Sequence, residues 1–79
     1  MKVQLIQGEF NSPDAIQLVS NMINLKIKYQ EGQIEKNNNE EDIKYRESKI
    51  KNLQNELFEL RNFLSTKDNV KIHASINIE

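Results

Sequence analysis

The side chains that could act as acids, bases or metal ligands are mostly carboxylates. Glu40 to Asp42 are consecutive, and consecutive residues of a helix point in different directions, so they do not form one ligand set. Glu31, Glu35 and Glu47 would lie near one another only across a helical hairpin. Carboxylate metal sites in helix bundles pair such groups with a histidine three residues further on, and none stands there. We therefore expect no metal and no other cofactor.

His73 is the one histidine, between Lys71 and Ser75. General acid–base catalysis needs a nucleophile or an acid beside the imidazole, and the sequence identifies neither. The chain has no cysteine, which excludes disulfides and thiolate metal sites, and its two glycines do not form a phosphate-binding loop. We predict that the chain is not an enzyme. The alternative is a site across a dimer interface, where His73 meets carboxylates of a second chain.

Basic residues gather in the middle of the chain, where they suggest contact with nucleic acid: Lys26, Lys28, Lys44, Arg46, Lys49 and Lys51. Acidic residues interleave with them, and 11 basic against 12 acidic residues give a net charge of −1. Such a balance weakens the attraction to phosphates. No apolar run is long enough for a signal peptide or a membrane span. We expect a cytoplasmic protein with no membrane partner, for which nucleic-acid binding is the weaker alternative.

Alternation of apolar and polar residues predicts a strand at each end of the chain. The last one covers about residues 70–78, with these apolar positions on one face: Val70, Ile72, Ala74, Ile76 and Ile78. The first covers about residues 2–7, with Val3 and Leu5 on the apolar face. Ile6 breaks this alternation, and Gly8 indicates a bulge or a bend before Phe10.

Start signals and periodicity predict a first helix over about residues 13–36. Ser12 is the expected N-cap, Pro13 the first helical residue, and Asp14 complements the helix dipole. The apolar residues form two adjacent rows: Ile16, Val19, Ile23, Ile27 and Ile34 in one, and Ala15, Leu18, Met22, Leu25 and Tyr29 in the other. The first half of this helix therefore needs two neighbours, and its second half needs one.

A second helix is predicted over about residues 40–65, after a tip loop at about 37–39. Asn39 is its expected N-cap. Its seam positions are three and four residues apart: Ile43, Arg46, Ile50, Leu53, Leu57, Leu60 and Leu64. Arg46 is the one charge in the seam. It pairs with Asp42 or Glu47, extends its charged end to solvent, or fixes the register of the hairpin.

The short polar link predicts a long antiparallel hairpin resembling a coiled coil, within an α+β fold of strand, helix, helix and strand. The two strands then run antiparallel and pair. A two-stranded ribbon is marginal alone, so we expect the wide half of the helices to cover its apolar face. Its outer edges stay unpaired. A chain of 79 residues also has a thin core, so we predict a homodimer that extends the sheet or pairs the hairpins.

The segments KIKYQEGQI and EEDIKYRESKIKNLQNEL, lying between short strands, resemble small uncharacterised bacterial proteins that form helical hairpins. The resemblance covers about half of the chain and implies a fold without an activity. The function we expect is that of a non-catalytic interaction or scaffolding module, which contacts a partner through its tip, residues 30–44, or through a strand edge. The candidate contacts are Tyr29, Ile34, Tyr45, Arg46 and Lys49, although the two tyrosines also have the alternative of stacking on each other.

Overall fold

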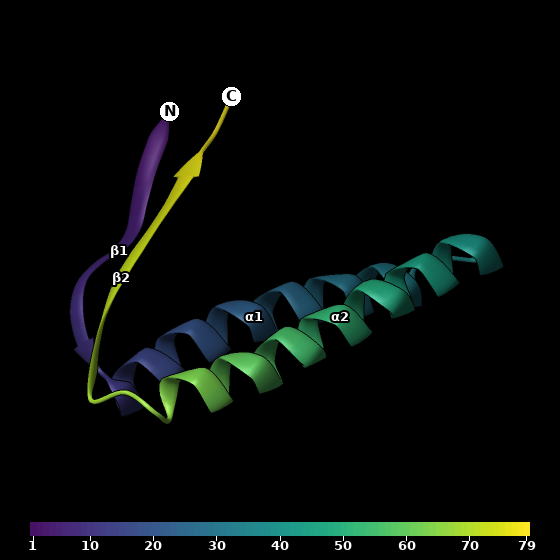
Figure 1. Ribbon diagram of the computed structural model, residues 1–79. Coiled ribbons are helices and arrows are strands. Elements are labelled where there is room, and N and C mark those ends of the chain that lie inside the picture. Colours follow the sequence, from purple (N-terminus) through teal and green to yellow (C-terminus); the bar gives the residue numbers. More distant parts are fainter.

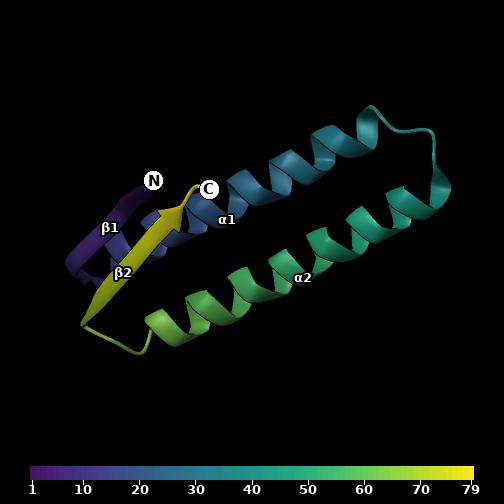
Figure 2. The same cartoon turned by 90° about the horizontal axis from the view of Figure 1, so that it is seen from above.

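The computed structural model describes all 79 residues and confirms the predicted order of strand, helix, helix and strand. The elements are β1 (Lys2–Asn11), α1 (Ser12–Glu35), α2 (Glu40–Leu64) and β2 (Asn69–Asn77). The two strands pair antiparallel as one two-stranded sheet. Figure 1 shows this ribbon rising from the base of the helical hairpin, with both chain ends at its far end. Seen from above in Figure 2, the helices lie side by side and the ribbon lies near the first turns of α1.

The register of the ribbon separates one apolar face from one polar face. Val3 pairs with Ile76 and Phe10 with Val70, while Gln7 pairs with His73. A shift in register between Gln4 and Ile6 leaves Leu5 without a partner, which corrects its predicted place on the apolar face. The extra residue moves Ile6 and Phe10 onto that face, because a shift of one residue exchanges the two faces of a strand. Strand β1 therefore continues to Asn11, well beyond the predicted end.

The two glycines lie in different backbone environments and should respond oppositely to alanine. Gly8 in β1 has a φ of 144°, which L side chains rarely adopt, whereas Gly32 lies within α1 and an added Cβ would meet no atom within 4 Å. We expect Gly8→Ala to lower the free energy of unfolding by on the order of 1 kcal/mol. Gly32→Ala should raise it by roughly 0.5–1 kcal/mol. Urea unfolding followed by circular dichroism checks both, and equal signs would contradict the assignment.

The N-cap of α1 is Asn11, which corrects the prediction of Ser12. The Asn11 side-chain oxygen accepts a hydrogen bond from the backbone N–H of Asp14 at 2.9 Å. The reason is that β1 ends directly at the helix, so Asn11 is the last extended residue. Ser12 instead joins the base of the hairpin: it is buried, its hydroxyl donates to the carbonyl of Leu64, and its N–H donates to the carbonyl of Asp68 at 2.9 Å.

The core of the chain is small and lies between the helices. Only five residues are buried: Ser12, Ala15, Ser20, Leu53 and Leu64. The predicted seam of α2 is half-buried or buried along its whole length, as are the isoleucines and the valine of the first row on α1. These two rows form the contact between α1 and α2. The seam of the second helix therefore faces the first helix.

Ser20 has a buried hydroxyl that forms no hydrogen bond. A buried polar group without a partner lowers stability, and alanine is also the better helix former. We expect Ser20→Ala to raise the free energy of unfolding by about 1 kcal/mol. Ser12→Ala is the matched control: its hydroxyl is bonded to Leu64, so the same change should lower stability. A loss of stability in Ser20→Ala, measured by urea unfolding, would contradict this.

The ribbon does not fold back over the hairpin, which corrects the prediction that the wide half of the helices covers its apolar face. It contacts the start of α1 and then departs from the helices (Figure 1). Ile76 and Ile78, near its far end, are exposed. The physical reason is the junction: β1 passes into α1 at Asn11 and Ser12 with no residues left for a reversal. The molecule measures 45 × 33 × 13 Å.

Candidate functional site

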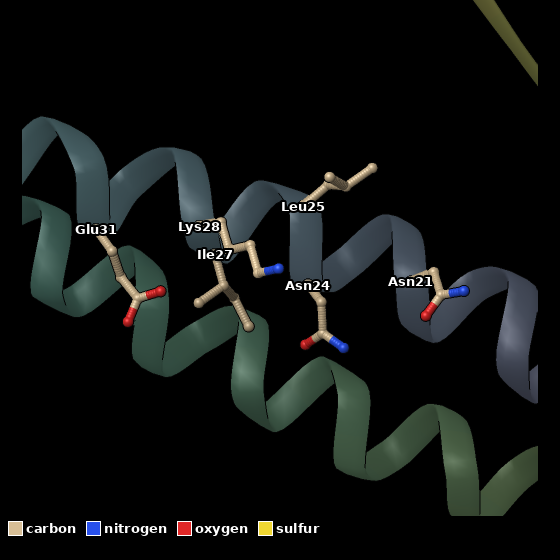
Figure 3. Close-up of a pocket in the computed structure, with 6 residues that line it drawn as sticks. All are labelled: Asn21, Asn24, Leu25, Ile27, Lys28 and Glu31. Atoms are coloured by element: carbon tan, nitrogen blue, oxygen red, sulfur yellow. The ribbon is translucent and has the colours of Figure 1, made fainter.

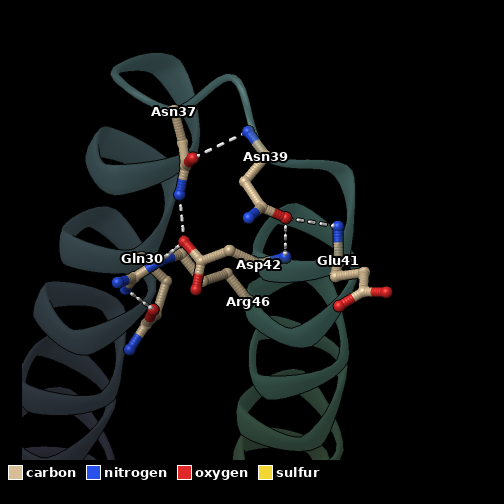
Figure 4. A network of polar contacts seen from close by, with 6 residues as sticks. All are labelled: Gln30, Asn37, Asn39, Glu41, Asp42 and Arg46. Carbon is tan, nitrogen blue, oxygen red and sulfur yellow. Dashed lines mark hydrogen bonds and ion pairs between the residues drawn. The ribbon is translucent and has the colours of Figure 1, made fainter.

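The tip of the hairpin contains a network of polar side chains, shown in Figure 4. Nε of Arg46 is 3.0 Å from Oδ2 of Asp42, and its Nη1 donates to Oε1 of Gln30 at 2.8 Å. The side-chain amide of Asn37 donates to the same Asp42 oxygen. Arg46 therefore pairs with Asp42 and links α2 to α1. Because this ion pair is partly exposed, its value lies in fixing the register of the helices more than in stability.

The tip also satisfies its own backbone groups. The side-chain oxygen of Asn39 accepts from the N–H groups of Glu41 at 2.9 Å and Asp42 at 3.2 Å, which confirms Asn39 as the N-cap of α2. The N–H of Asn39 in turn donates to the side chain of Asn37 at 2.9 Å. These bonds fold the Asn-rich link onto the start of α2 (Figure 4). The tip is thus a closed, hydrogen-bonded structure.

The five predicted contact residues fall into two groups. Ile34 and Arg46 are half-buried in the hairpin. Tyr29 and Tyr45 are 61% and 58% exposed, and the ammonium of Lys49 lies 4.8 Å from the ring centroid of Tyr45. This cation–π contact explains the placement of Lys49. The structure therefore leaves Tyr29, Tyr45 and Lys49 accessible, and their role as partner contacts stays a prediction.

Charged residues of the helices are mixed in sign on the surface. Figure 3 shows one flank of α1, where Asn21, Asn24, Lys28 and Glu31 line an open hollow. On α2 a similar hollow is lined by Lys44, Glu47, Ser48 and Lys51. Neighbouring charges of opposite sign cancel much of each other's field. Neither hollow is a basic patch.

His73 lies on the polar face of the ribbon, opposite Gln7. Its neighbours on this face are the paired residues Glu9 and Lys71, and together they line an open hollow of about 270 Å³. A search of the structure finds no group of three His, Cys, Asp or Glu side chains that could hold a metal ion. This arrangement is that of a solvated strand face.

The most unusual surface of the chain is apolar. Along α1 the residues Leu18, Met22, Leu25 and Tyr29 follow one another at intervals of four, three and four, so they form one row, which we call the α1 stripe. Exposure rises along it, from half-buried at Leu18 to 66% at Leu25, which points away from α2 (Figure 3). The sequence predicts this row of apolar residues, and it predicts that a second structural element, besides α2, packs against it. The structure supplies only the base of the ribbon as that neighbour.

The α1 stripe is continuous with the apolar face of the ribbon. Phe10 of β1 and Leu18 of α1 line the same open hollow of about 380 Å³. From there the apolar face runs along both strands to their far end. We call the two parts together the open apolar surface; it comprises the α1 stripe and Val3, Ile6, Phe10, Val70, Ile72, Ala74 and Ile76.

No family model, no curated protein and no solved structure matches this chain. Neither helix is long and apolar enough to cross a membrane.

Proposed function

We propose that the protein is a small non-catalytic interaction or scaffolding module that acts as a homodimer in the cytoplasm. The observation that carries the proposal is the exposed area, 6304 Å² for a chain of 9.3 kDa. A folded monomer of this mass typically exposes about 5,000 Å². The excess of roughly 1,300 Å² is similar to what each chain buries in a permanent dimer.

Three further features support a second copy. The ribbon is a two-stranded sheet, which is marginal by itself. The core holds only five buried residues, and there is no disulfide to compensate for it. A net charge of −1 also gives little repulsion between two copies. In such a dimer the closed tip, or a free strand edge, remains available for a further protein partner.

The dependence of stability on protein concentration tests this proposal. If folding and dimerisation are coupled, the urea midpoint of unfolding rises as the protein concentration is raised. A midpoint that is the same at low and high micromolar concentration would contradict a homodimer in which the second copy completes the fold.

Nucleic-acid binding, the alternative, gains no support from the charge distribution. Arg46 is engaged with Asp42, and Lys44 and Lys51 of α2 stand beside Glu47. We expect no retention of duplex DNA or of RNA in a gel-shift assay at low salt, where binding to phosphates is strongest. A shift that weakens steeply with added salt would restore this alternative.

A further inference from the structure

We infer that the two copies meet through their open apolar surfaces, so that the ribbon of each protomer covers the α1 stripe of its partner. This inference rests on the proposed homodimer and specifies its interface. The competing arrangements are strand addition at a ribbon edge and pairing through α2, on which Phe58 and Phe63 are exposed apolar residues.

The exposure of the apolar side chains rises along α1, away from the base of the hairpin. Ala15, at the base, is 0% exposed, whereas Leu25 and Tyr29 further along the same side are mostly exposed. The ribbon of the same chain lies only at the base of the hairpin, so it leaves the far half of this side open (Figure 1). The ribbon is open at its far end, away from the hairpin. Ile76, near that end, is exposed, whereas Val70, at the base of the ribbon, is half-buried. Each chain thus leaves uncovered one apolar helix segment and one apolar ribbon segment.

In a dimer with twofold symmetry, the open helix segment of each chain can contact the open ribbon segment of the other chain. In a symmetric dimer, if residue i of one chain contacts residue j of the other, the reverse contact also forms. The α1 stripe from Leu18 to Tyr29 is about 17 Å long at 1.5 Å per residue. The ribbon from Phe10 to Val3 is about 23 Å long at 3.3 Å per residue. One ribbon is therefore long enough to cover one stripe, and the contact forms twice.

The open apolar surface is also suited to burial by the chemistry of its side chains. The side chains of the open apolar surface carry no charge, so bringing two copies together buries mainly apolar groups; Asp14 lies in the hollow that joins its two parts and has to keep contact with water. Charged residues are close by on α1, because Lys28 and Glu31 line the same open hollow as Leu25. Asn24, in contrast, points to the opposite side of the helix from Leu25 (Figure 3). Strand addition at an edge would pair backbone groups but would leave Leu25 and Tyr29 in water. The face-to-face arrangement covers both.

Disulfide trapping tests the interface, because the native chain has no cysteine. One preparation carries Leu25→Cys and another carries Ile76→Cys, and the two are mixed and allowed to oxidise. We expect a disulfide between the two different chains to be the main product, identified by mass spectrometry of the linked peptides. The matched control replaces Leu25→Cys by Asn24→Cys, whose side chain points to the opposite side of α1 (Figure 3), and should give far less of the linked product.

A second pair, Met22→Cys with Ala74→Cys, repeats the test at two positions where cysteine introduces no charge and no larger polar group. Circular dichroism checks that each variant folds. Equal trapping with Asn24→Cys, or efficient trapping of Phe58→Cys with itself, in a protein of dimeric mass would overturn this interface and leave the homodimer standing. A monomeric mass for the native chain would overturn both proposals.

Discussion

Replacing Leu53 with alanine should lower the free energy of unfolding by about 2–4 kcal/mol. Leu53 is 7% exposed and packs in the middle of the seam between α1 and α2. The truncation loses the burial of the side chain and leaves a cavity that two rigid helices cannot close. A domain of this length is stabilised by only about 4–12 kcal/mol in total, so the loss is a large share. Urea unfolding followed by helical circular dichroism measures it.

Leu25→Ala is the matched control for Leu53→Ala, because it deletes the same atoms from a side chain that is 66% exposed within one chain. In an isolated monomer this change would cost no more than about 0.5 kcal/mol. In the dimer proposed above Leu25 is covered by the partner, so the cost should lie between that value and the cost at Leu53. A loss below about 1 kcal/mol at Leu53 would contradict the position of the core.

Replacing Leu25 with aspartate should raise the dissociation constant of the dimer by on the order of a hundredfold or more. The carboxylate would have to leave water to enter an interface that offers it no cation. The exposed position of Leu25 within one chain lets the hairpin itself keep its helices. The expected product is a helical monomer at concentrations where the native chain is dimeric, detected by sedimentation together with circular dichroism.

Asn24→Asp is the control for Leu25→Asp, because it introduces the same carboxylate on the opposite side of the same helix (Figure 3). It should leave the dimer intact. Dimers of equal strength in both variants would mean that the α1 stripe is not in the interface. Loss of helix together with loss of the dimer in Leu25→Asp would mean that the hairpin does not stay folded without its partner.

The arrangement of the elements was predictable because each has a strong local signal. In β2 apolar and polar residues alternate strictly, and in α2 the apolar seam positions are three and four residues apart. Each pattern is visible in the sequence of the element itself, and the structure contains both elements. The N-cap of α1 was less predictable, because both Asn11 and Ser12 are good caps. The choice between them depends on where β1 ends, and β1 ends late because of the bulge at Leu5.

The candidate surface was predictable only in part. The second apolar row on α1 is visible in the sequence, and so is its need for a neighbour. Which neighbour covers it depends on the direction in which the ribbon leaves the base, and this is set by the short junction between Asn11 and Ser12. The partner of Arg46 on α1, Gln30, was also hidden, because it depends on the register of the two helices.

The mass of the native protein in solution, from light scattering after size exclusion over a wide range of concentrations, tests most directly whether a second copy completes this fold. We expect a mass near twice 9.3 kDa, decreasing only at high dilution. A mass of 9.3 kDa at every concentration, with the helices and the ribbon still folded, would show that the chain is stable with its apolar surface open and would contradict the homodimer.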